Sequence, residues 1–268
     1  MSRIYTFLLI LFFLPAAYAV DYDTAYKAYN EGDYETALKG FTELAAENNI
    51  KAQFYLGAMY REGKGVEQDY KKSLEWYLKA AEQGEPKAQH NVALFYHNGL
   101  GVDRDFNTAI EWYTKAANQN YIPSITNMAM LYFKGQGVEK DIDTAIKWWR
   151  KAADLGSKGA QHNMGLMYFL GQGVKQDYAE ALKWYRKAAE QGSQAAQNSL
   201  GVMYFEGNGV DKDLIEAYAW IKLAESSGYD QAKLNVGIIE SSLNEEQLQK
   251  AKKRADEYIN KYPSEKTN

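Results

Sequence analysis

The sequence contains three histidines, whose side chains can bind a metal and can gain or lose a proton near neutral pH. They are His90, His97 and His162. A zinc site needs three or four ligands with a supporting shell, but no His-x-x-x-His pair or acidic cluster accompanies them. We therefore expect the histidines to line a surface, and we expect neither a metal nor a cofactor.

Nucleophile and phosphate motifs are missing from the sequence. It contains no Cys, no Ser-x-x-Lys, no Lys-Thr-Gly and no Gly-x-Ser-x-Gly. Five Gly-x-Gly pairs occur without the glycine spacing of a phosphate-binding loop, so we interpret them as turns. No two carboxylates are singled out as an acid and a base. We therefore predict a protein that is not an enzyme.

A period of 36 residues organises the chain from about residue 50 to 240. Tryptophan recurs at this period at Trp76, Trp112, Trp148, Trp184 and Trp220. The Gly-x-Gly pairs follow the same period, beginning at Gly63, Gly99, Gly135, Gly171 and Gly207. Tryptophans in such a series could stack on sugars or bases, but their strict repetition favours packing between repeats.

Each period has the pattern of two helices. Residues 87–99 and 105–117 both carry apolar side chains at helical spacing. An Asp stands where each second helix begins, and Asp177 with Glu180 and Asp213 with Glu216 resemble capping boxes. A left-handed residue after each second helix is predicted at Gly84, Asn120, Gly156, Gly192 and Gly228.

Small residues recur where neighbouring helices should touch, as in the series Gly57, Ala93, Ala129, Gly165, Gly201 and Gly237. A helix pair with one apolar face per helix buries that face by stacking on its neighbours. The sequence therefore predicts an all-α solenoid. We expect it to comprise a helix pair with a tight turn in 20–50, five repeats in 51–230, capping helices in 231–262 and a loose tail in 263–268.

Residues 1–19 have the pattern of a secretory signal peptide. Arg3 precedes an apolar stretch, and Ala17-Tyr18-Ala19 resembles a cleavage site, so we expect cleavage after Ala19. A membrane anchor is the alternative, but the apolar stretch is shorter than the ~20 residues of a span. We expect an exported protein that is periplasmic or secreted and is not embedded in a membrane. The formal charge of −4 and the absence of a basic run argue against a nucleic-acid partner.

The segments 88–96, 99–102 and 109–117 closely resemble the Sel-1-like repeat, a variant of the tetratricopeptide repeat with a longer loop between its helices. The resemblance covers nearly all of the sequence after residue 19. It implies a right-handed superhelix of helix pairs that serves as a scaffold for protein partners. A Cys-rich branch of the family is linked to penicillin binding, but this sequence has no Cys.

The resemblance also implies that the first helix of each pair lines a concave groove. Three sets of equivalent positions, four and three residues apart, share that helix face. The first set includes Phe54, His90 and His162; the second includes Leu94, Met130 and Leu166; and the third holds Arg61, His97, Phe133, Phe169 and Phe205. Exposed in a groove, these side chains would bind an extended or helical peptide, and otherwise they would pack against adjacent helices.

Three functions remain open from the sequence. The first is a non-catalytic scaffold of the bacterial envelope or secreted space, which binds a protein or peptide in the groove. The second is a secreted effector that acts on host proteins. The third is an enzyme that acts on β-lactams or peptidoglycan, and only the resemblance to the Cys-rich branch of the family supports it.

Overall fold

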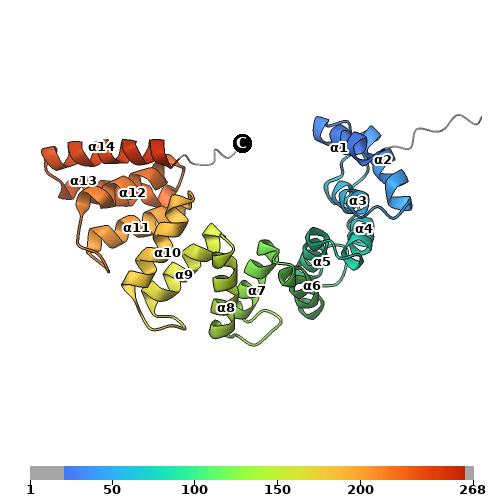
Figure 1. Ribbon diagram of the computed structural model, residues 1–268, viewed down its shortest axis with the longest axis horizontal. Helices are drawn as coiled ribbons and strands as arrows, with labels where there is room; N and C mark the ends of the chain where they lie inside the picture. Colours follow the sequence, from blue (N-terminus) through green and yellow to red (C-terminus); the bar gives the residue numbers. More distant parts are fainter. Residues whose placement is uncertain (1–20, 263–268) are drawn as a thin grey trace, which may run out of the picture. The chain divides into compact units, whose positions relative to one another are not determined.

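The chain folds into helices joined by short turns and loops, and the computed structural model describes residues 21–262 (Figure 1). This described part contains fourteen helices and no strand, so the prediction of an all-α fold is confirmed. The predicted signal peptide over 1–19 and the predicted tail over 263–268 lie outside the described residues.

The helices form two compact units, which divide between Gln83 and Gly84. The first unit contains α1 (Tyr22–Glu31), α2 (Tyr34–Ala46), α3 (Ile50–Glu62) and α4 (Tyr70–Glu82). The second unit begins with α5 (Pro86–Asn98), α6 (Phe106–Asn118), α7 (Ile122–Lys134), α8 (Ile142–Asp154) and α9 (Lys158–Leu170). It continues with α10 (Tyr178–Glu190), α11 (Gln194–Glu206), α12 (Leu214–Ser226), α13 (Asp230–Ser242) and α14 (Glu245–Lys261).

Within each unit, a helix packs on the helix before it and on the helix after it. This holds for α1 to α4 in the first unit and for α5 to α13 in the second. The last helix, α14, departs from the rule and packs on α12. The apolar stripes predicted from the sequence are thus buried between consecutive helices, as in a solenoid.

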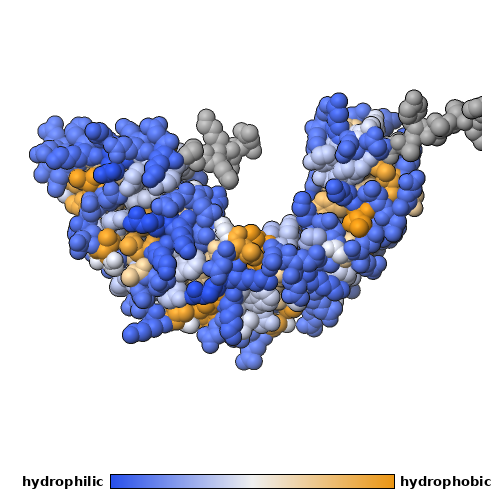
Figure 2. All heavy atoms as spheres, in the orientation of Figure 1, coloured by the Kyte–Doolittle hydropathy of each residue, from blue (hydrophilic) through white to orange (hydrophobic). Residues whose placement is uncertain are grey.

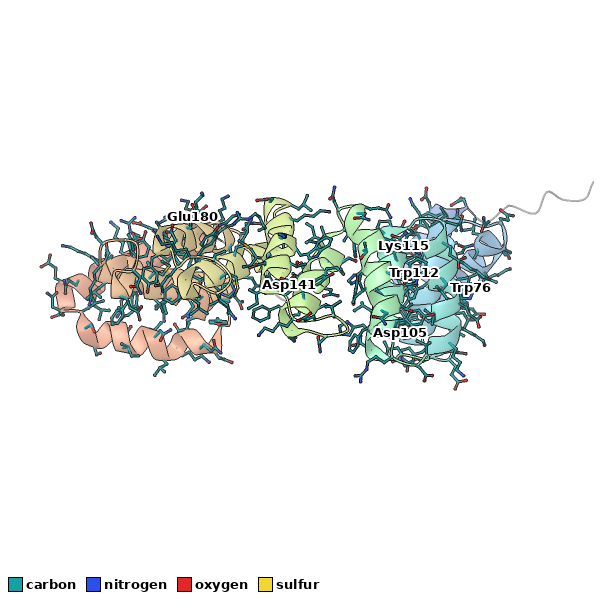
Figure 3. The ribbon with its side chains drawn as sticks, turned by 90° about the horizontal axis from the view of Figure 1, so that it is seen from below. Trp76, Asp105, Trp112, Lys115, Asp141 and Glu180 are labelled. Carbon is teal, nitrogen blue, oxygen red and sulfur yellow. The ribbon has the colours of Figure 1, made fainter. Side chains whose placement is uncertain are left out.

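The predicted signals lie at the ends of the helices. Asp105 Oδ1 accepts hydrogen bonds from the backbone N–H groups of Asn107 and Thr108, at 2.9 and 3.2 Å, and so caps α6. Figure 3 shows Asp105 at one end of this helix, with Trp112 and Lys115 further along it. After α6, Asn120 has a φ of 61°, the left-handed conformation that Gly and Asn tolerate best.

The predicted capping boxes form only in part. Asp177 and Asp213 accept from the backbone N–H of Glu180 and Glu216, but neither glutamate returns the bond. The Glu216 carboxylate instead accepts from the Tyr258 hydroxyl at 2.6 Å, because α14 lies against α12. A full capping box is present at the start of α14, between Asn244 and Gln247.

Close approach explains two sets of glycines. A Cβ at Gly165 would lie 2.6 Å from the ring of Tyr185, so this glycine lets α9 and α10 approach closely. A Cβ at Gly137, in the loop before α8, would lie 2.2 Å from the Cβ of Phe106 at the start of α6. The second glycine of the loop therefore joins one helix pair to the pair before it.

The tryptophans of the repeat differ in burial along the chain. Trp184 and Trp220 are buried and lie in clusters that include residues of neighbouring repeats. Trp112 is half-buried, and Lys115 Nζ lies 3.7 Å from the centroid of its ring. Lys79 lies over Trp76 at 3.9 Å and Lys151 over Trp148 at 5.7 Å, so the lysine one turn later covers part of each half-buried ring, a cation–π contact.

No helix within residues 21–262 combines the length and the apolar composition needed to cross a bilayer.

Candidate binding surface on the first helices

Hydrogen bonds join the first helices of neighbouring pairs in the second unit. His90 Nδ1 and Ser124 Oγ lie 2.9 Å apart between α5 and α7. Asn235 Nδ2 donates to Asn198 Oδ1 at 2.9 Å between α13 and α11, and Ser199 Oγ lies 3.5 Å from His162 Nε2 between α11 and α9. These first helices therefore lie side by side and present a shared surface.

All of the predicted groove residues are half-buried. In the first unit these are Phe54 and Arg61 on α3. In the second unit they are His90, Leu94 and His97 on α5, Met130 and Phe133 on α7, His162, Leu166 and Phe169 on α9, and Phe205 on α11. The structure places them at the edge between the core and solvent.

Three phenylalanines of the first and third sets pack against the second helix of their own pair. Ring centroids lie 5.6 Å apart for Phe54 and Tyr77, and 5.1 Å apart for Phe133 and Trp149. Phe169 contacts Tyr178 in the same way, at 5.3 Å. One side of each ring thus contributes to the pair, and the remainder of the ring faces outward.

The three histidines are held in their neutral form. Burial lowers the pKa of His90 to about 4 and also lowers the pKa of His162. Burial lowers the pKa of His97, with help from the positive charges of Arg104 and Lys134. The surface is therefore uncharged at these positions near neutral pH. In residues 21–262, no three His, Asp or Glu side chains lie close enough together to hold a metal ion.

Two hollows lie next to each other on this surface. One has a volume of about 190 Å³ and is lined by Leu166, Phe169, Leu170, Tyr185, Asn198, Ser199 and Val202. The other has a volume of about 180 Å³ and is lined by Val202, Phe205, Glu206, Ile221, Asn235, Ile238 and Ile239. They share Val202, so a mainly apolar track, lined in part by polar side chains, runs over α9, α11 and α13.

Three exposed apolar side chains belong to this region and were not among the predicted residues. Leu170 is 55% exposed, Leu234 is 72% exposed and Ile238 is 45% exposed. Leu234 and Ile238 continue the first two sets by one more period of 36 residues, so the repeat register could have identified them. Leu170 occupies the position of Glu62, Asn98, Lys134 and Glu206 in the other repeats. An apolar residue at an otherwise polar position could have identified it from the sequence.

Two larger hollows lie elsewhere in the second unit. The first, of about 620 Å³, adjoins the loop before α8, where Asp141 already caps that helix. The second, of about 450 Å³, includes Arg150 and Lys151. Arg150 donates to the Tyr168 hydroxyl and Lys151 to the Ala117 carbonyl, so these cations already serve the packing between helices. On the face shown in Figure 2, hydrophobic residues form separate patches among hydrophilic ones.

Comparisons with known proteins agree with this architecture. A family model described as Sel1 repeat matches residues 50–85, 86–121, 122–157, 159–193 and 194–229. The chain is 36% identical to a Sel1 repeat protein from Oxalobacter formigenes, with a TM-score of 0.73 over 78% of this chain and 86% of that one. None of the curated proteins matches this sequence.

A second solved structure is a protective antigen present in uropathogenic Escherichia coli strains, which displays an SLR fold. It is 32% identical to this chain, with a TM-score of 0.57 over 90% of this chain. The chain spans 60% of the length of that antigen.

Proposed function

Because the chain belongs to the Sel1 repeat family, we propose that it is a non-catalytic scaffold that binds a protein or peptide partner on its first helices. The observation that carries this proposal is the pair of joined apolar hollows over α9, α11 and α13. The predicted groove residues Leu166, Phe169 and Phe205 line them.

The size of the hollows suits side chains of a partner. At about 190 and 180 Å³, each is slightly larger than the ~150 Å³ apolar cavity that accommodates a benzene ring. Each hollow would therefore take one large aliphatic or aromatic side chain. Burial of such a side chain stabilises a complex by about 1.5–3 kcal/mol before the costs of association are subtracted.

Polar side chains in the lining of the track would fix the position of the partner. Asn198, Ser199 and Asn235 supply amide and hydroxyl groups within or between the hollows. Such groups can donate to and accept from the backbone of a bound segment. We infer that apolar contacts supply most of the affinity and that these polar side chains supply the register.

The proposed location is the bacterial periplasm, after cleavage of the signal peptide at Ala19. This part of the proposal rests on the sequence of residues 1–19. Fractionation of cells that express the full chain would test it. Mature protein in the periplasmic fraction supports the proposal, whereas mature protein in the culture medium favours the secreted effector.

A pair of leucines allows a matched test of the surface. Leu170→Glu places a charge beside the first hollow, at a side chain that is 55% exposed. Leu155→Glu makes the same change at a leucine that is 41% exposed and lies outside the track. Both variants should remain folded, because surface substitutions change stability by about 0.5 kcal/mol or less.

The experiment is affinity capture from envelope extracts with purified residues 20–268, followed by titration of the captured protein against each variant. We expect Leu170→Glu to weaken binding at least tenfold and Leu155→Glu to leave it unchanged. Far-UV circular dichroism checks that both variants are folded. Equal binding by the wild-type chain and Leu170→Glu would reject the track as the binding surface.

A further inference from the structure

The last two helices of the described chain, α13 and α14, do not pack on each other as the helices of the other pairs do. In the second unit, the first helices α5, α7, α9 and α11 each pack on the helix that follows them. The helix that follows α13 is α14, but it packs on α12. The contact includes Trp220 and Tyr258, whose ring centroids are 4.6 Å apart, and an ion pair of 3.3 Å between Arg254 and Glu216.

The connection between α13 and α14 accounts for this difference. The other first helices of the second unit end in a loop that contains two glycines with positive φ, such as Gly207 and Gly209. Leu243 and Asn244 replace that loop, and both have extended backbone angles. Without the long loop, α14 does not fold back along α13, and its apolar stripe is buried on α12.

As a result, no described helix covers one face of α13. A Cβ at Gly201 of α11 would lie 2.4 Å from Ile221 Cγ1, because α12 covers that glycine. Within residues 21–262, a Cβ at the equivalent Gly237 of α13 would have no atom of another helix within 4 Å. Leu234, three residues before Gly237, and Ile238, the residue after it, lie on the same side of the helix and are 72% and 45% exposed.

We propose that an amphipathic helix of a partner protein packs on this face of α13, in the place that α14 leaves open. Other repeats of the same chain show which side chains pack on the equivalent face of a first helix. In the first and fourth repeats, a tyrosine of the second helix (Tyr77 or Tyr185) covers the small residue (Gly57 or Gly165). The partner helix should therefore present a large side chain to Gly237 and apolar residues to Leu234 and Ile238.

This inference deepens the proposed function, on which it rests, because it gives the partner segment a secondary structure and a place. The second hollow adjoins the face, since Ile238 lines both. Glu206 on the rim of that hollow favours a basic residue at the facing position of the partner. A second copy of the chain is a poorer occupant, because one face of a 13-residue helix offers far less than the ~800 Å² per partner of a stable interface.

The probe is a synthetic peptide with the sequence of residues 177–191, which contains α10 and Tyr185. A staple between positions 183 and 187, whose lysines are exposed on α10, keeps the short peptide helical. Fluorescence anisotropy of the labelled peptide measures its binding to purified residues 20–268. We expect saturable binding, and at least tenfold weaker binding of a peptide that carries Tyr185→Ala.

Variants of the protein locate the peptide. Gly237→Leu fills the open position and should weaken binding at least tenfold, whereas Leu155→Glu should leave binding unchanged. The Gly237 backbone is helical and its surroundings are open, so this variant should melt no lower than the wild-type chain. Absence of saturable binding, or unchanged binding to Gly237→Leu, would overturn the inference.

Two further outcomes separate this inference from the proposed function. If Leu170→Glu abolishes peptide binding and Gly237→Leu does not, the peptide binds in the first hollow. This result overturns the inference, while the proposed function stands. A dimer in analytical ultracentrifugation that Gly237→Leu abolishes would show that a second copy covers α13, and this also overturns the inference. If Leu170→Glu fails to weaken the captured partner but the peptide still needs Gly237, only the proposed track fails.

Discussion

The two glycines Gly201 and Gly237 occupy the same position of the repeat, and an alanine substitution should affect them in opposite directions. Both lie within helices, α11 and α13, where alanine is favoured over glycine by about 0.5–1 kcal/mol. That gain in helix propensity applies equally to both positions. Any difference between the two variants therefore reports the packing around the added methyl group.

The surroundings of the two methyl groups differ sharply. At Gly201 the new Cβ would lie 2.4 Å from Ile221 Cγ1 and 2.8 Å from the backbone oxygen of Ala217. The oxygen is part of α12, so the helices must separate, and such overpacking costs about 1–3 kcal/mol. At Gly237 no other helix of the described part of the chain has an atom within 4 Å of the new Cβ. We expect Gly237→Ala to stabilise the fold by about 0.5–1 kcal/mol and Gly201→Ala to destabilise it by up to about 2 kcal/mol.

Urea unfolding of purified residues 20–268, followed by far-UV circular dichroism, measures both changes. The dependence of the free energy on urea should be the same in the wild-type chain and both variants, so that midpoints can be compared directly. Because a repeat stack can unfold in sections, amide exchange in α12 provides a second measurement close to both sites. Equal shifts in the same direction for the two variants would refute the claim that α13 is uncovered.

Other predictions concern the histidines, the tryptophans and the last helix. The pKa of folded His90 is about 4, below its unfolded value, so the unfolded chain binds the extra proton first and stability should fall as pH drops from about 6.5 to 4. His90→Asn, which copies Asn198, should remove this loss, on the order of 3 kcal/mol, in urea titrations at pH 7 and pH 4; an unchanged pH dependence would contradict the assignment. Trp220→Ala should lower the free energy of unfolding in urea by about 3–5 kcal/mol, and Trp112→Ala should lower it clearly less, because the Trp112 ring is only half-buried. Similar losses in the two variants would contradict this difference in burial. Tyr258→Phe removes only the hydrogen bond to Glu216 and should cost about 1–3 kcal/mol, while Tyr229→Phe, whose hydroxyl bonds to the exposed Gln231, should cost little.

Much of the fold follows from local features of the sequence. Asp105 and Asn120 mark the two ends of α6 because a side-chain cap and a left-handed residue act within a few residues of the helix end. The period of 36 residues predicted that Gly165 lies where two helices touch, because repeated helix pairs contact each other at equivalent positions. The face shared by the predicted groove residues followed from helical spacing in the same way.

The degree of exposure of that face did not follow from spacing. Phe133 and Phe169 lie on the predicted side of their helices, but contacts with Trp149 and Tyr178 leave each of them only partly open. The hollows depend on the side chains that surround each of these positions. Ile221 stands where Tyr77, Tyr113, Trp149 and Tyr185 stand in the other repeats, and it lines the hollow between α11 and α13. Such space is a property of several helices together.

The ends of the helices and the apolar stripe of each helix follow from the sequence alone, because both depend on residues that are close along the chain. The surface that each stripe meets depends on the packing of the whole fold. The stripe of α14 would suit α13 or α12 equally well by its pattern, and the short connection through Leu243 and Asn244 directs it to α12. Burial of apolar surface has no direction of its own, so the chain connection decides which face of α13 stays open to solvent.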